Sequence, residues 1–434
     1  MPVTVRMWAT GVLVAGLLSG CLGGPEPASK QGFTPVGRPD ATSADADADT
    51  ATSPVIADLQ SRQSLLPPDG PFAFVAASVI EASAGASVAE LRVARLRSQA
   101  RAKNWLPQIG PSINLTSLSG LATDLLLQQA LFDNGQRKAE RAFAAADVEI
   151  AAVTLATEMN DRVYQGLSHY VRAEQARAQA EVAMRSVARL AEYDAIITER
   201  MEGGLADRSE QQVIRQHLTE LQATLAADRT AETSALAELA ALAATPLDSV
   251  RGIDSLPPDD DRVFPLSVLR ARSEGNQLVA EANIHRADML PGLRATTNIG
   301  TGGLQPGLRL GSGLLNAGMR DSMDALQATG EVAGKRTAQA AEDARRRIVA
   351  LERQIATLQS REASGEKVLA QTAENLDLFT QQYQVGRRTL LELVNQFHDF
   401  ARLEREQAGL RHEATLLRLE IARDRGQLVA GAHL

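Results

Sequence analysis

Two long stretches of the chain carry apolar residues at steps of three, four and seven, with polar residues between them. This spacing places the apolar side chains on one stripe of a helix and predicts long helices that pack as coiled coils. The stretches run from Gln136 to about Glu202 and from Met319 to Tyr383. At 1.5 Å per residue, each helix would be roughly 100 Å long. The stripes comprise Val148, Leu155, Met159, Val163 and Tyr170, and then Ile348, Leu351, Ile355 and Leu358.

Shorter helical runs flank each long one. Returning runs follow Gly204 and Gly386 and extend to about Leu242 and Leu428. The stripe of the later run is Leu410, Leu417, Ile421 and Leu428. Further helices are predicted at about 75–105 and 266–289, and each ends at a Leu-Pro pair.

Two patches alternate between apolar and polar residues and therefore predict β-hairpins, at 110–132 and 292–315. Ser119-Gly120 is the expected turn of the first hairpin, and 300–303 with Pro306-Gly307 that of the second. Two isolated hairpins are not stable alone. Their apolar faces are suited to lipid in a closed barrel, and four strands per chain require an oligomer to close one.

The same order of elements is written twice. Leu106-Pro107 recurs as Leu290-Pro291, the segment 131–137 recurs as 314–320, and Gly204 recurs as Gly386, with offsets of 184, 183 and 182 residues. We therefore expect an internal twofold repeat. The predicted organisation is a first repeat over 73–250, a linker over 251–265 and a second repeat over 266–430.

Composition favours this mainly α architecture with a small transmembrane β part. The chain has 2 Trp, 4 Tyr and 9 Phe among 434 residues, too few for the aromatic bulk of ordinary globular cores. Such a composition is typical of long, mutually packed helices. The net charge of −8 provides no basic face for nucleic acid.

The N-terminus predicts export. The apolar run Met7–Leu18 is too short to span a membrane and fits a signal peptide over 1–20. The residues before Cys21 resemble the lipobox of bacterial lipoproteins. That resemblance implies cleavage before Cys21, its lipidation (a palmitate-type anchor) and, with Leu22 following, sorting to the outer membrane. The alternative is a plain secretory signal with an incidental cysteine.

Residues 21–72 are rich in Pro, Gly, Ser and Asp and predict a lipidated flexible tether.

The segment 383–395, Tyr-Gln-Val-Gly-Arg-Arg-Thr-Leu-Leu-Glu-Leu-Val-Asn, resembles the periplasmic-tip turn of the TolC family of outer-membrane efflux and export channels. Leu-Pro-Gln-Ile-Gly (106–110) and Gln-x-Leu-Phe-Asp-Asn-Gly (129–135) also resemble family signatures. The resemblance covers about 75–430. It implies a homotrimer with a 12-stranded barrel in the outer membrane and a 12-helix tunnel across the periplasm.

The resemblance also implies partners. The tip would meet a periplasmic adaptor (a membrane fusion protein) joined to an inner-membrane pump or to the ABC transporter of a type I secretion system. The chain itself would be a passive conduit for a cargo that the sequence does not specify: drug, metal ion, polysaccharide or protein.

A charged gate is the first site that the resemblance implies. Arg388 and Glu392 match an arginine and an acidic residue of the constriction, and Glu210 matches Glu392 in the first repeat. Trimerisation would place three copies of each carboxylate around one axis. The sequence departs from the family at Asn395, where a second acid is frequent. The alternative is an ordinary surface pair at i,i+4 spacing.

The turns and the strands supply the other candidate residues. The adaptor contact would centre on Gly204, Leu205, Val385, Gly386 and Arg387. Alternatively, the two glycines only terminate helices. Strand alternation places Arg294 and Arg309 toward the barrel lumen, or else near the membrane interface or the turn.

No catalytic set is found, and we expect neither a cofactor nor a metal. The six histidines show no metal-ligand pair at helical spacing and have no cysteine partner. The phosphate-loop-like segment 330–337 lacks the required spacing and a preceding strand.

The competing function is a membrane-tethered periplasmic coiled-coil scaffold or adaptor without a pore. Lipid-facing strand alternation distinguishes the two, because a scaffold has no use for it.

Overall fold

A computed structural model of the chain describes residues 53–83, 85–117, 120–257, 261–300, 303–311 and 318–433. The predicted signal peptide, Cys21 and the tether up to residue 52 lie outside the described residues. So do most of the second copy of the 131–137 segment and parts of both hairpin turns.

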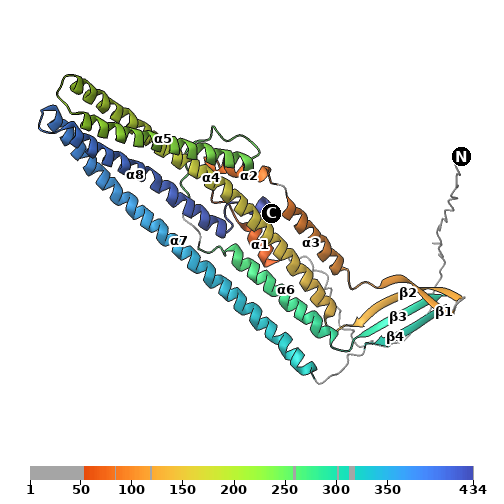
Figure 1. Ribbon diagram of the computed structural model, residues 1–434. Helices are drawn as coiled ribbons and strands as arrows, with labels where there is room; N and C mark the ends of the chain where they lie inside the picture. The colour runs from red at the N-terminus through yellow and green to blue at the C-terminus, as the bar shows by residue number, and fades with distance from the viewer. Residues whose placement is uncertain are drawn as a thin grey trace, which may run out of the picture. The chain divides into compact units, whose positions relative to one another are not determined.

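Two long helices and their returning partners make up most of the described chain (Figure 1). Helix α4 (Gln136–Glu202) has 67 residues and α7 (Met319–Gln384) has 66. The returning helices α5 (Arg208–Leu242) and α8 (Leu390–Asp424) have 35 residues each. Helix α4 packs against α5 and α8, and α6 (Leu266–Asp288) packs against both α4 and α7.

The predicted apolar stripe of α4 is confirmed as its buried face. Val163 and Tyr170 are almost fully buried, and Leu155 is nearly so. Tyr170 meets Phe72 edge-on, with ring centroids 6.2 Å apart, and its hydroxyl donates to the Gly252 carbonyl at 2.7 Å. The hydroxyl thus keeps a partner inside an apolar cluster. In α7 the stripe residues Ile348, Leu351 and Ile355 are buried beside Ile421 of α8.

A single antiparallel sheet contains all four predicted strands, in the order β1-β2-β3-β4. The strands are β1 (Gln108–Ser117), β2 (Gly120–Phe132), β3 (Leu293–Gly300) and β4 (Gly303–Leu310). Strands β2 and β3 pair with each other, so the sheet joins the two halves of the chain. Strands β1 and β2 have 10 and 13 residues, whereas β3 and β4 have 8 each.

The assignment of Pro306-Gly307 to a turn is wrong. These residues lie inside β4, opposite Thr297 and Thr296 of β3. Strand β4 is an end strand of the sheet, and proline is tolerated there because an end strand need not donate on both sides. The two strands instead stay paired as far as Gly300 and Gly303, at the turn end of the hairpin.

The helix predicted over about 75–105 is two helices. Helix α2 (Pro71–Glu81) and helix α3 (Ala86–Ala102) are separated at Gly85, whose φ of +64° ends helical continuity. In the described part of the chain, no single helix is both long and apolar enough to cross a membrane. The α2–α3 pair, bent by 64°, meets that criterion when its two helices are counted together.

The end of the predicted tether is also folded, contrary to expectation. Helix α1 (Pro54–Ser61) begins where the Ser53 hydroxyl accepts the Val55 N–H at 3.2 Å. Its Val55 and Leu59 are almost fully buried in a cluster that α4 and α6 complete. Four-residue spacing puts both on one helix face, so burial rather than length stabilises this short element.

The returning helix of the second half also ends earlier than predicted. Helix α8 stops at Asp424, and Gly426 with φ +63° reverses the chain. Leu428 is nevertheless buried, in the irregular segment that follows. Its N–H donates to the Asn160 side chain at 2.9 Å, which fixes this segment against α4.

Candidate functional site

The sheet has one apolar and one polar face. Cross-strand pairs such as Leu293 with Leu310, and Ile299 with Leu304, place apolar side chains on one side. Much of this face is exposed, with Leu308 at 70%. The exposed large apolar residues of the four strands are Ile109, Leu125, Leu131, Phe132, Ile299, Leu304, Leu308 and Leu310. An exposed apolar surface of this kind marks contact with a membrane or a partner.

The two candidate lumen arginines face each other across β3 and β4. Arg294 pairs directly with Arg309 in the strand register, on the polar face of the sheet. Like charges placed opposite each other repel unless water or anions screen them. The hollow that they line also contains Asp133 and Asp288, at the foot of the sheet. Both arginines are exposed, in a charged part of the polar face.

Both long helices end in the same backbone motif. Gly204 and Gly386 have φ of +70° and +73°. The N–H that follows each glycine reaches back five residues, from Leu205 to the Arg200 carbonyl and from Arg387 to the Gln382 carbonyl, both at 2.8 Å. This is a Schellman cap, whose left-handed residue is nearly always glycine. The two predicted tip turns therefore have the same local geometry.

The two turns lie at the end of the helices away from the sheet (Figure 1). Leu205 is 82% exposed and Val385 is 70% exposed. The two turns are connected, because the Arg200 guanidinium lies over the Tyr383 ring, 4.8 Å from its centroid. Leu205 and Val385 thus present apolar side chains to solvent on a fixed backbone.

Arg388 and Glu392 form an ion pair within one chain, with Nη1 and Oε1 3.2 Å apart. Glu392 also accepts the Thr389 N–H at 3.0 Å and completes a capping box at the start of α8. The hydrogen bond from the Thr389 backbone, with further bonds from its hydroxyl and from Arg388, holds the pKa of Glu392 below its usual value. The carboxylate therefore keeps its charge under mildly acidic conditions.

Glu210 occupies the equivalent place in the first half. Asp207 is the N-cap of α5 and Thr389 is the N-cap of α8, so Glu210 and Glu392 are each the third residue of their helix. Glu210 lies in the first turn, where a carboxylate is favoured by the helix dipole. The pairing inferred from sequence thus matches helix position, independently of any role in gating.

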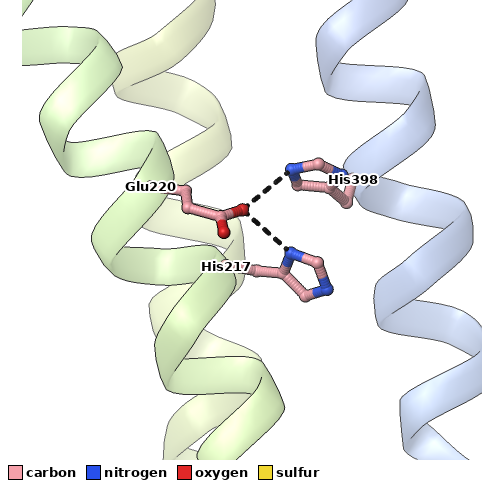
Figure 2. A group of neighbouring side chains, drawn as sticks. All are labelled: His217, Glu220 and His398. Carbon is pink, nitrogen blue, oxygen red and sulfur yellow. Dashed lines mark hydrogen bonds and ion pairs between the residues drawn. The ribbon is translucent and has the colours of Figure 1, made fainter.

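A group that sequence reasoning missed lies farther along α5 and α8. His217 and Glu220 are one turn apart on α5, and His398 of α8 points toward them (Figure 2). Glu220 Oε2 lies 3.4 Å from His217 Nδ1 and 3.7 Å from His398 Nε2. Burial, reinforced by the nearby His217, lowers the pKa of His398. The i,i+3 spacing of His217 and Glu220 was the available sequence signal, but the third member comes from the other half of the chain.

Comparison with known proteins gives matches at the level of structure. No protein-family model and no curated protein sequence matches the chain. The outer membrane protein VceC of Vibrio cholerae superposes with a TM-score of 0.70, over 82% of this chain and 96% of its own, at 16% identity. The outer-membrane channel OprN superposes with a TM-score of 0.69, over 85% of this chain and 93% of its own, at 16% identity. The chain has the fold of outer-membrane channel proteins.

A third match supports the same assignment. The outer membrane channel MtrE of Neisseria gonorrhoeae, in its open state, superposes with a TM-score of 0.62 over 88% of this chain and 95% of its own, at 16% identity. The fold expected from the TolC-family resemblance is therefore confirmed: long packed helices and a small four-stranded antiparallel sheet. Nearly the whole length of each of these channels is represented in this chain.

Proposed function

We propose that the chain is one subunit of an outer-membrane exit duct, a passive conduit that carries cargo across the periplasm and the outer membrane. The observation that carries this proposal is the sheet, which exposes an apolar face on a fold shared with outer-membrane channels. Exposed apolar strands are costly in water and favourable in lipid. In this proposal the chain is anchored by Cys21 and localised to the outer membrane.

The oligomer follows from the sheet edges. Within the described residues β1 and β4 are the end strands of the sheet, and an open edge inside a bilayer leaves backbone groups without partners. Pairing β4 of one subunit with β1 of the next removes every edge. Three subunits of four strands give the twelve-stranded barrel of the proposed homotrimer. Exposed apolar residues on α7, including Val368 and Leu378, would then contact the neighbouring subunit.

The helix-end turns are the proposed contact with a periplasmic adaptor and, through it, an inner-membrane pump or an ABC transporter. Leu205 and Val385 supply exposed apolar surface, and the exposed Arg387 follows Gly386 in the second turn. Schellman caps hold both turns in one conformation before binding, which lowers the entropic cost of association.

Single-particle imaging of the full-length, detergent-extracted protein tests the proposed duct. We expect a threefold hollow cylinder whose helical part is about 100 Å long or more, because α4 and α7 rise about 1.5 Å per residue. A solid or monomeric rod would instead support the scaffold function and would contradict the closed barrel.

The proposed gate is tested by removing charge while preserving the helix caps. Glutamine can replace glutamate in the capping box of α8, and the α5 cap is the Asp207 carboxylate. Glu392→Gln combined with Glu210→Gln therefore removes the two carboxylates of each subunit and leaves both caps in place. We expect a several-fold loss of cation preference in single-channel recordings, because a ring of carboxylates concentrates cations at a constriction. The matched control is Glu331→Gln, an exposed carboxylate of α7 paired with Lys335. Unchanged selectivity in the double variant would contradict the assignment of the gate.

A further inference from the structure

The two helical hairpins, α4–α5 and α7–α8, meet near their turns at a group of three metal-ligating side chains. His217 and Glu220 come from α5 and His398 comes from α8 (Figure 2). Their ligand atoms all lie within 4.8 Å of one another. Both histidines are about ten residues from the start of their helices, so the group lies roughly 15 Å from the turns.

We propose that His217, Glu220 and His398 form a binding site for a divalent transition-metal ion of the Zn²⁺ type. Two imidazoles and one carboxylate are the donor set of three-ligand Zn²⁺ sites, which leave the fourth position to water. Imidazole is also a ligand for Cu²⁺ and Ni²⁺, whereas Mg²⁺ and Ca²⁺ prefer oxygen donors alone. This site does not depend on the proposed conduit and is assigned from the geometry of these three side chains.

The distances fit the edges of a coordination shell better than they fit hydrogen bonds. Bonds of about 2.0–2.1 Å in a tetrahedral site place neighbouring ligand atoms roughly 3.4 Å apart. Glu220 Oε2 is 3.4 Å from His217 Nδ1 and 3.7 Å from His398 Nε2. An N–H···O hydrogen bond is ordinarily 2.7–3.2 Å long, so both separations exceed that range. With all three ligand atoms within 4.8 Å of one another, a small movement of the side chains would bring them around one ion.

A neighbouring side chain orients the carboxylate. Gln216 Nε2 donates to Glu220 Oε1 at 3.1 Å and thereby leaves Oε2 directed at the two imidazoles. Groups that hold a ligand by its second atom commonly tune metal sites in this way. The rings of His217 and His398 lie beside each other, with centroids 4.4 Å apart and a tilt of 35°.

The three side chains lie at the edge of an apolar cluster, between buried residues and solvent. The apolar cluster behind them contains Leu218, Leu221, Val394 and Phe397. The two histidine side chains are mostly buried, at 19% and 27% exposed, while Glu220 is half exposed and leaves a route for ions. An ion bound here would link α5 to α8 directly and would tie together hairpins from the two halves of the chain.

Zinc titration of the full chain, purified without a histidine tag, tests the site. We expect about one Zn²⁺ per chain by calorimetry, with no comparable heat from Mg²⁺ or Ca²⁺. Co²⁺ in place of Zn²⁺ is expected to give intense visible absorption bands of a four-coordinate site, which Zn²⁺ then displaces. A pale, six-coordinate Co²⁺ spectrum or no saturable zinc binding would overturn the proposal.

Three variants distinguish this site from non-specific metal binding by surface histidines. His217→Ala and His398→Ala are each expected to weaken zinc binding about tenfold or more and to remove the Co²⁺ bands. His285→Ala is the matched control, because His285 lies on α6 with Glu281 4.0 Å away at i,i+4 spacing. Equal losses in all three variants would overturn the site. Circular dichroism of each variant shows whether it is folded, and the Co²⁺ spectrum of the unmodified chain tests the geometry without any variant.

Discussion

Replacing Leu125 and Leu308 by aspartate is expected to abolish assembly of the chain in the outer membrane. Both residues belong to the exposed apolar face, Leu125 in β2 and Leu308 in β4, away from the strand ends. A charged side chain on a lipid-facing strand costs roughly 1–3 kcal/mol, depending on depth, and a trimer would repeat each cost three times. Membrane fractionation and the yield of heat-resistant oligomer measure the loss.

The opposite face of the same two strands provides matched controls. Gln128→Asp in β2 and Gln305→Asp in β4 introduce the same charge on the polar face, because Gln128 pairs with Thr296 and Gln305 with Asn298. We expect both control variants to assemble nearly as well as the unmodified chain. Normal assembly of the Leu125→Asp, Leu308→Asp double variant would mean that the apolar face does not contact lipid, and the scaffold function would then be preferred.

Arg62→Ala is expected to lower the free energy of unfolding by about 3 kcal/mol or more. The Arg62 side chain is only 3% exposed and makes an ion pair with Asp58 at 2.6 Å. Its Nη2 also donates to the Phe264 carbonyl at 2.9 Å and its Nη1 to the Arg425 carbonyl. Truncating Arg62 leaves buried acceptors without partners, and such groups are costly.

The thermal unfolding midpoint of the detergent-purified protein measures this loss. Arg101→Ala is the control, because Arg101 pairs with Glu140 at 3.4 Å while remaining 60% exposed. Exposed pairs contribute about 0–1 kcal/mol, so the control is expected to shift the midpoint little. A similar midpoint for the two variants would show that Arg62 does not hold these segments together.

The long elements were predictable because their signals are local and repeated. Helix α4 begins and ends at Gln136 and Glu202, as the apolar stripe predicted. The start of α4 is fixed by Asp133, whose carboxylate accepts the N–H groups of Gly135 and Arg137 at 3.1 and 3.2 Å. Period-two alternation likewise located both hairpins, since their faces differ in polarity.

The short elements and the convergent side chains were not predictable, because tertiary contacts create them. Helix α1 is too short to be stable alone, and it forms because Val55 and Leu59 find a cluster contributed by residues far along the chain. The break between α2 and α3 at Gly85 was not predicted, because the residues on both sides of it favour a helix. His398 joins His217 and Glu220 only once α5 and α8 meet, and no sequence period encodes that meeting.

The hydrogen bonds that connect Arg62 and Ser64 to the C-terminal segment affect the order in which the chain folds. Arg62 and Ser64 bond to carbonyls of Arg425 and Leu428, 363 and 364 positions away in sequence. Contacts between such distant segments form slowly, because a long loop must close before they stabilise anything. As the chain is delivered from its N-terminus, the core around α1 and α2 cannot be completed until residues near 428 arrive. Until then the early segments keep apolar surface exposed, and such partly folded chains are prone to aggregate.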